Sequence, residues 1–488
     1  MTQHTCNRLI IAILAIGITS QLASAGSRPN IVFILTDDQA PFAVAAAGDE
    51  RFVTPNIDRI FHAGAHLTNS FVTTPVCSPS RVGLIASRYG TEMGITDWIN
   101  PRREAMLGLD PQTPTWPKLL AAAGYRNGLF GKWHLGTQDK YHPTQMGYHA
   151  FLGIRTGGCA PQDPTLELLD GRVEKMAGYT CDIFTDHALQ FIRDQSERPF
   201  LVSLHFRAPH SPWLPVRPED WQPFERLDPV IPNPDYPDLD VALIKQRTRE
   251  YLASVKSVDR NVGRVLALLE QLQLANNTIV IFTSDHGYNL GEHGVWFKGN
   301  AVRALTKNPP QEWKNIPRNR RPNLWDTSLR VPTAVRWPNV IKPSSKVTHT
   351  VSNLDWFPTL LAMAGVDLPR DANIRGRDIT PLLRGEDVLW DDDLYAEYSM
   401  HHGATTHMRG YRTPQWKYMR DFASPGRAEL YDLVNDPHEM TNLADSDDSQ
   451  HVRVKQELEQ RILRKMKGLD DPALSSDAAV PQPDGPAQ

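Results

Sequence analysis

Cysteine is scarce in this sequence: four of its 488 residues are Cys. Cys6 precedes an apolar run near the N-terminus, so the remainder of the chain carries Cys77, Cys159 and Cys181. A content this low excludes a small scaffold held together by disulfides. The chain must instead be stabilised by a hydrophobic core, and 488 residues suffice for one large domain and a smaller one.

An excess of one charge is also missing. The 52 Lys and Arg residues nearly balance the 56 Asp and Glu residues, which leaves a formal net charge of -4. This balance offers no electrostatic case for binding nucleic acid. Local clusters of charge therefore matter more here than the total.

Long apolar runs are absent apart from one at the N-terminus. Arg8 is followed by the apolar residues 9–16 and then by Ala-Ser-Ala at 23–25. This pattern predicts a signal peptide over residues 1–25, and the run is too short for a stable membrane anchor. We therefore expect an exported protein, periplasmic or extracellular.

Several short apolar runs end in residues that carry chemistry. Runs 31–36, 125–130, 199–206 and 278–283 have the composition of strands buried on both faces, as in a parallel sheet. Their exits are Asp37-Asp38, Lys132 with His134, His210, and Asp285-His286. Open α/β sheets bind ligands at this edge, and adjacent carboxylates favour a hard cation between them. A solvated turn is the simpler explanation for any one exit, but not for four.

The stretch Pro75–Arg81 places a cysteine at a predicted helix start. Pro79 suits an early helical position, so Cys77 faces free backbone N–H groups that favour anions, with Arg81 one turn along. One interpretation is an ordinary buried thiol. A thiolate nucleophile of the tyrosine-phosphatase type is weaker, because its arginine would fall at Gly83. The third interpretation depends on a resemblance.

Five segments resemble type I sulfatases and occur in that family's order: residues 29–38, 77–81, 131–134, 284–287 and 429–443. The resemblance implies an alkaline-phosphatase-like α/β fold, with a large mixed sheet flanked by helices and a smaller C-terminal α+β subdomain. It also implies one divalent cation, usually Ca²⁺, and conversion of Cys77 to formylglycine, an aldehyde that acts as its hydrate. A formylglycine-generating enzyme would be the maturation partner. We expect the catalytic domain at 27–383, the subdomain at 384–468, and a disordered tail at 469–488, which is rich in Pro, Ser, Ala and Asp.

The resemblance also assigns roles to individual residues. The metal-ligand positions it matches are Asp37, Asp38, Cys77, Asp285 and His286. The catalytic positions are Cys77, Arg81, Lys132, His134, His210 and Lys298. His210 is the expected proton donor to the leaving alcohol, and His134 the base that releases sulfate from the hydrate. Many family members carry Asn in place of His286, and imidazole is an uncommon Ca²⁺ ligand.

A basic, Pro-rich stretch from Gly299 to Leu324 indicates an anionic substrate, although a solvated surface loop would have a similar composition. Its Arg318, Arg320 and Arg321, together with His401 and His402, are candidate substrate contacts. With twelve tryptophans available for stacking, a sulfated carbohydrate is the expected substrate, ahead of a small sulfated molecule.

Alternatives stay open at this point. If Cys77 is modified, Cys159 and Cys181 could pair as a disulfide in an oxidising compartment, although two unpaired thiols are equally consistent. The function could also be that of a formylglycine-dependent phosphonate or phosphodiester hydrolase, or of an inactive glycan-binding homologue.

Overall fold

The computed structural model of the chain describes residues 28–48, 52–303, 305–306 and 315–475. The predicted signal peptide lies outside these residues. No helix among those described is both long and apolar enough to cross a membrane.

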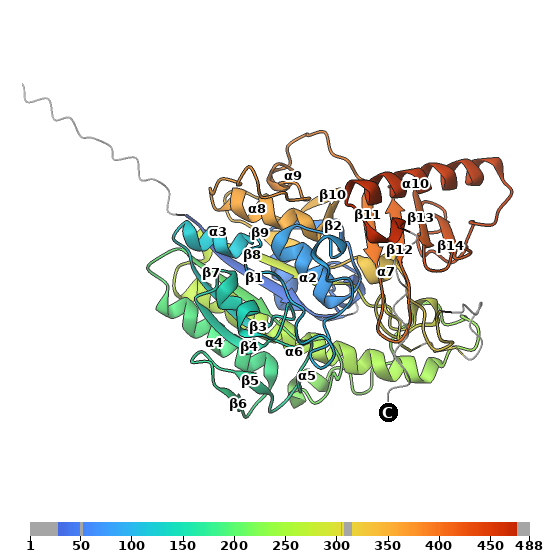
Figure 1. Cartoon of the computed structure of the whole chain (residues 1–488). Helices are drawn as coiled ribbons and strands as arrows, with labels where there is room; N and C mark the ends of the chain where they lie inside the picture. The colour runs from blue at the N-terminus through green and yellow to red at the C-terminus, as the bar shows by residue number, and fades with distance from the viewer. Residues whose placement is uncertain (1–27, 49–51, 304, 307–314, 476–488) are drawn as a thin grey trace, which may run out of the picture.

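A ten-stranded sheet forms the centre of the molecule (Figure 1). In spatial order its strands are β10 (Ser345–Ser352), β2 (Ala65–Phe71), β9 (Ala334–Arg336), β8 (Thr278–Ser284), β1 (Asn30–Thr36), β7 (Phe200–His205), β3 (Arg126–Lys132), β4 (Ala150–Ile154), β5 (Thr165–Glu167) and β6 (Val173–Lys175). Strands β8, β1, β7 and β3 are parallel neighbours, whereas β9, β5 and β6 pair antiparallel. The sheet is therefore mixed, as predicted.

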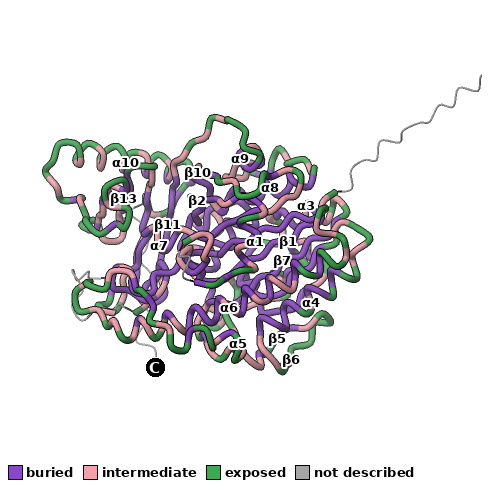
Figure 2. Tube along the Cα trace, turned by 180° about the vertical axis from the view of Figure 1, so that it is seen from behind, coloured by how far each residue is buried: buried purple, intermediate pink, exposed green. Residues whose placement is uncertain are grey.

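Helices cover both faces of this sheet because its central strands are apolar on both sides. In β1, Phe33 and Leu35 pack into one core, while Val32 and Ile34 pack into the other. The first face is covered by α2 (Cys77–Ala86), α3 (Trp116–Ala122), α8 (Trp356–Met363) and α9 (Thr380–Arg384). The second face is covered by α1 (Pro55–His62), α4 (Thr180–Asp194) and α6 (Val241–Gln271). Two short helices, α5 (Pro218–Trp221) and α7 (Asp326–Leu329), complete this part. Figure 2 shows the sheet buried between these layers.

A smaller α+β unit follows. Its antiparallel sheet consists of β11 (Leu394–Tyr398), β12 (Met408–Arg412), β13 (Trp416–Asp421) and β14 (Ala428–Asp432). Helix α10 (Ser449–Gly468) packs on this sheet through Leu458, Ile462 and Met466. Both parts of the predicted fold class are thus confirmed. We propose the boundary between them near residue 383, at the end of α9.

The start of the predicted disordered tail is wrong. Residues 469–475 are ordered, with a 3-10 turn at Pro472–Leu474. Asp471 pairs with buried Arg409 through two contacts, Oδ2 to Nε at 2.6 Å and Oδ1 to Nη2 at 2.8 Å. Polar composition pointed to disorder here, but the ion pair with buried Arg409 holds these residues in place. Residues 476–488 lie outside the described part.

The disulfide considered between Cys159 and Cys181 is absent, and both thiols are free. Cys181 is the second residue of α4 and faces α6, where the Ser257 hydroxyl donates to its sulfur at 3.4 Å. Burial raises the pKa of the Cys181 thiol to about 11. These cysteines are buried or half-buried small side chains that pack between elements.

Candidate active site

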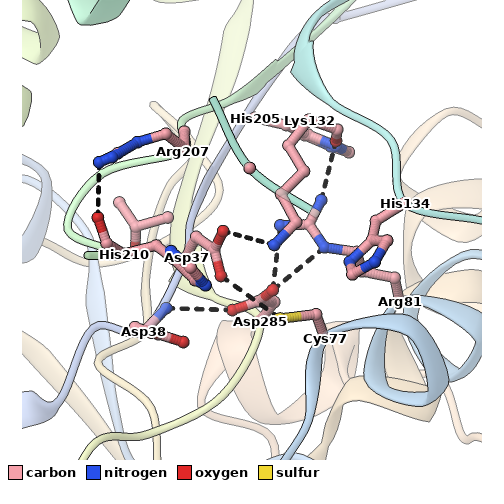
Figure 3. A network of polar contacts seen from close by, with 12 residues as sticks. Asp37, Asp38, Cys77, Arg81, Lys132, His134, His205, Arg207, His210 and Asp285 are labelled. Atoms are coloured by element: carbon pink, nitrogen blue, oxygen red, sulfur yellow. Dashed lines mark hydrogen bonds and ion pairs between the residues drawn. The ribbon is translucent and has the colours of Figure 1, made fainter. Parts of the chain in front are cut away.

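The four parallel central strands deliver polar side chains to one edge of the sheet. Asp37 and Asp38 follow β1, Asp285 and His286 follow β8, and Lys132 ends β3. His210 lies on the loop that follows β7. Because β8, β1, β7 and β3 are adjacent and parallel, their exits meet in a single buried cluster (Figure 3).

Cys77 lies at the first position of α2, which is buried along its whole length. Its Sγ lies 3.0 Å from Lys298 Nζ, 3.4 Å from His286 Nε2 and 3.7 Å from Asp37 Oδ1. Burial alone would raise the pKa of this thiol, but Lys132 and Lys298 outweigh it and hold the pKa well below its usual value. The surroundings of position 77 therefore favour a negative charge.

Three cations pair with the three aspartates of the cluster. Lys132 Nζ lies 2.6 Å from Asp37 Oδ2, and Lys298 Nζ lies 2.6 Å from Asp38 Oδ1. Arg81 reaches Asp285 Oδ2 with Nε at 3.1 Å and Nη2 at 3.0 Å. Burial would raise the pKa of Asp37, but the Lys132 ammonium lowers it to about 2. All three pairs are buried, so each would be costly to break.

The carboxylates fit a divalent cation. Asp37, Asp38, Cys77 and His286 each offer a ligand atom, and these atoms lie within 4.8 Å of one another. Asp38 Oδ2 is buried without a hydrogen-bond partner, which is costly for a carboxylate oxygen unless a cation contacts it. His286 Nδ1 lies 3.0 Å from the Gly287 carbonyl and donates to it, so Nε2 is the nitrogen that faces the cluster. Burial would lower the pKa of this ring, but Asp285 and Asp38 raise it to about 8, and a bound cation would take the place of the proton on Nε2. Asp285 Oδ1 is 3.4 Å from that Nε2, at the edge of the group.

Two further histidines border the cluster, each with a tautomer set by a carbonyl. His134 Nε2 lies 3.1 Å from the Ile99 carbonyl, so Nδ1 is left as the acceptor, and it is buried without a hydrogen-bond partner among the described residues. His210 Nδ1 lies 2.7 Å from the Ser211 carbonyl, which leaves Nε2 to exchange a proton. Burial lowers the pKa of both rings, and for His210 the carboxylates of Asp38 and Asp37 oppose that effect.

Two features of the site were not predicted. Arg207 is buried just beyond the end of β7 and donates to the carbonyls of His210 and Pro212. Its position directly after a buried strand, which it shares with the other site residues, is the sequence signal that could have identified it. Gly131 has φ +128°, and a Cβ there would lie 1.8 Å from the His205 carbonyl. Only glycine fits at this position, which brings β3 against β7 and fixes where Lys132 emerges.

The candidate substrate contacts interact with residues other than those of the Cys77 cluster. His401 Nε2 is 2.7 Å from Glu104 Oε1, and His402 Nδ1 is 3.2 Å from Asp97 Oδ2. Arg320 donates to the His402 carbonyl at 3.1 Å. Arg318, Arg320 and Arg321 line a cavity shared with the C-terminal unit. Contact of these five residues with a substrate remains a prediction.

An α/β fold with a cysteine, three carboxylates and three cations at the carboxyl edge of its sheet is the framework of a hydrolase for anionic esters. Residues 29–366 match the sulfatase family model, and residues 319–468 match the model of the C-terminal region of N-sulphoglucosamine sulphohydrolase. The chain belongs to the sulfatase family and is a sulfuric ester hydrolase.

Curated relatives and solved structures agree with this membership. The chain is 28% identical to N-acetylglucosamine-6-O-sulfatase of Bacteroides thetaiotaomicron, over 91% of this chain and 87% of the relative. It is 29% identical to human steryl-sulfatase, over 77% of this chain and 73% of the relative. A protein solved in complex with its substrate D-glucosamine-2-N,6-O-disulfate superposes with a TM-score of 0.78 and 25% identity, covering 92% of this chain and all of the other.

Proposed function

We propose that this sulfatase removes sulfate esters from a sulfated glycan, using a formylglycine made from Cys77 and a divalent cation, with Ca²⁺ the expected ion. The observation that carries the proposal is the position of Cys77. Its sulfur lies at a helix N-terminus, within 3.7 Å of a lysine, a histidine and an aspartate from three other segments. An unmodified structural thiol has no need of such surroundings.

The cation and the modified residue would supply the nucleophile. Asp37, Asp38, Asp285 and His286 would hold the ion, whose charge lowers the pKa of a coordinated hydroxyl, and formylglycine would provide a hydrated aldehyde. The carboxylate-rich ligand set supports a hard cation such as Ca²⁺. Arg81 holds Asp285 in place with two contacts to one oxygen.

Lys132 and Lys298 would bind the sulfate group. Each ammonium has three N–H donors, and the described structure uses some of them on Asp37 and Asp38. The remaining donors, with the backbone N–H groups that begin α2, are suited to sulfate oxygens. Because both lysines are buried, they act in a medium of low dielectric where such contacts are strong.

The two histidines would move protons on opposite sides of the reaction. His210 would donate from Nε2 to the leaving alcohol, and a sulfate bound beside the ring would raise its pKa toward the protonated form. His134 would accept a proton at Nδ1, which faces position 77 while Nε2 is held by Ile99. Each ring thus has one nitrogen fixed by a carbonyl and the other available.

A glycan is the proposed substrate class for two reasons. The N-acetylglucosamine-6-O-sulfatase aligns with 91% of this chain. The protein solved with a disulfated glucosamine superposes on 92% of this chain. Steryl-sulfatase is similar over a smaller share, so a hydrophobic substrate is the less favoured candidate. Export through the predicted signal peptide would give the enzyme access to extracellular glycans.

The experiment measures desulfation of a panel of sulfated mono- and oligosaccharides, with matched aryl sulfate and aryl phosphodiester substrates beside it. Wild-type protein should release sulfate from members of the panel, Cys77→Ala should be inactive, and Cys181→Ala should retain activity as the matched control. The peptide containing residue 77 should have the mass of the aldehyde.

Faster turnover of the phosphodiester would contradict the sulfatase reaction and favour the other formylglycine-dependent hydrolase. An unmodified thiol and no turnover in protein from the native host would favour a glycan-binding homologue.

A further inference from the structure

A cavity of about 350 Å³ lies between the segment 316–325 and the C-terminal unit. Four arginines line it: Arg318, Arg320, Arg321 and Arg427. Its lining includes none of Cys77, Lys132, His134, His210 and Lys298. The volume falls in the range of small-ligand sites in proteins and is large enough for a substituted sugar ring.

The charges around the cavity are unevenly neutralised. Glu439 is 2.7 Å from Lys417, and Arg427 is 3.5 Å from Asp421 and also donates to the Pro322 carbonyl. Those groups are therefore satisfied internally. Arg321 differs, since its Nη2 is buried and has no hydrogen-bond partner.

No carboxylate pairs with the Arg321 guanidinium among the described residues. Burial lowers its pKa, and nearby Arg427 adds to that effect, while Tyr236 and Glu429 oppose it. Glu429 itself accepts from Trp325 Nε1 at 3.0 Å and from the Tyr431 hydroxyl at 2.7 Å. Arg321 is half-buried, and its Nη2 has no hydrogen-bond partner, so this guanidinium is available to an anion from outside the chain.

Aromatic side chains supply the other walls. Trp325 stacks on His293 with the ring centroids 4.0 Å apart, and half-buried Tyr236 lines the cavity beside them. Aromatic walls with a few charged groups are typical of sites that bind sugar rings bearing anionic substituents. The cavity therefore combines both kinds of contact that an acidic sugar requires.

The cavity wall is joined to the active site by the backbone. The Arg321 N–H donates to the Ala301 carbonyl at 3.1 Å, three residues after Lys298. Between them, the Gly299 N–H donates to Pro75, two residues before Cys77. The segment that forms this wall of the cavity therefore also borders the residues around Cys77.

We propose that this cavity binds a second acidic sugar unit of an oligosaccharide whose scissile sulfate ester lies at Cys77, with Arg321 contacting the anionic group of that unit. This inference rests on the proposed function and narrows its substrate class to glycans with at least two anionic groups. It also places the C-terminal unit, whose Arg427, Glu429 and Tyr431 line the cavity, beside that second sugar unit.

The test compares Arg321→Gln with Arg193→Gln, a matched charge removal on the exposed surface of α4. Steady-state kinetics use a singly sulfated monosaccharide and an oligosaccharide bearing the same ester plus further sulfates. Loss of one charged hydrogen-bond partner should raise KM for the oligosaccharide about tenfold. The KM for the monosaccharide and the kcat values for both substrates should stay within about twofold of wild type. In the control variant Arg193→Gln, all KM and kcat values should stay within the same range.

Binding is measured separately, so that failure of the two proposals can be told apart. Calorimetry uses inactive Cys77→Ala protein, with and without Arg321→Gln, against tetrasaccharides from heparin, chondroitin sulfate, carrageenan and ulvan. Weaker binding of the best ligand to the double variant supports the cavity even if wild-type protein hydrolyses none of them. Equal affinities, equal effects on mono- and oligosaccharide, or no binding in the panel would overturn the inference.

Discussion

Arg207 shows how a residue that lies outside the predicted constellation can control it. Its guanidinium is buried, and this burial lowers its pKa, while Asp37 and Asp38 are among the groups that oppose the effect. It donates to the carbonyl of His210 at 2.7 Å (Figure 3) and to the carbonyl of Pro212 at 2.9 Å. These contacts fix the loop that presents the His210 ring, so we regard Arg207 as a positioning residue.

Replacing Arg207 with lysine should misplace His210, because a single ammonium cannot reproduce the planar fork that holds two carbonyls. We expect kcat for an aryl sulfate to fall about tenfold or more, with KM within about twofold. The pKa that His210, as the proposed proton donor, contributes to the pH–rate profile should also shift. Arg217→Lys, at a partly exposed pair with Asp182, is the control. An unchanged pH profile would show that Arg207 is only structural.

At the scale of elements, the sequence patterns located the central strands well and the start of the C-terminal tail poorly. The stripe of apolar residues in α6 and the buried runs of β1 and β8 follow directly from local composition. The order of residues 469–475 does not, since it depends on Arg409, which is 62 residues from Asp471. A composition-based reading cannot detect such a partner.

Asp471→Asn tests that contact. Removing the charge leaves Arg409 buried without a counter-ion, so we expect a loss of about 3 kcal/mol in the free energy of unfolding. Asp470→Asn, at an exposed neighbour, should change it by less than about 0.5 kcal/mol. Denaturant titrations followed by circular dichroism measure both. Equal stability of the two variants would contradict a structural role for residues 469–475.

At the scale of the whole molecule, a histidine clamp joins the two units. His402 of the C-terminal unit lies between Asp97 and Glu104 of the catalytic part, at 3.2 Å and 3.3 Å. The same loop carries Ile99, whose carbonyl fixes the His134 tautomer. Burial would lower the pKa of His402, but the two carboxylates outweigh it and raise the pKa to about 9.

This clamp should make stability depend on pH. A pKa raised from 6.5 to about 9 contributes stability that is complete below pH 6.5 and is lost as the pH rises through about 9. We expect the free energy of unfolding to decrease by about 3 kcal/mol over that window. His402→Gln should flatten the dependence, whereas His451→Gln on α10 should leave it. A profile that is unchanged in His402→Gln would refute the assignment.

The cation site should also be visible in the stability of the whole protein. An ion that binds only the folded state raises the melting temperature with its concentration. Added Ca²⁺ should therefore stabilise chelator-treated protein and restore sulfatase activity, and Asp38→Asn should lose both responses. Asp447→Asn, at an exposed carboxylate, should keep them. If another divalent ion stabilises the protein and restores activity while Ca²⁺ does not, the proposed metal is wrong and the proposed cation site is still supported.

The sequence by itself determined the chemistry of the site: which residues follow each buried strand, and that Cys77 begins a helix. Those are local properties, because strand burial and helix starts are written in neighbouring residues. Only the tertiary structure decided which charges neutralise one another. It brought Asp97 to His402 and Arg409 to Asp471, and it left Arg321 Nη2 without a partner at the wall of a cavity. These pairs join residues 305 and 62 positions apart, and no periodic pattern in the sequence records such distances.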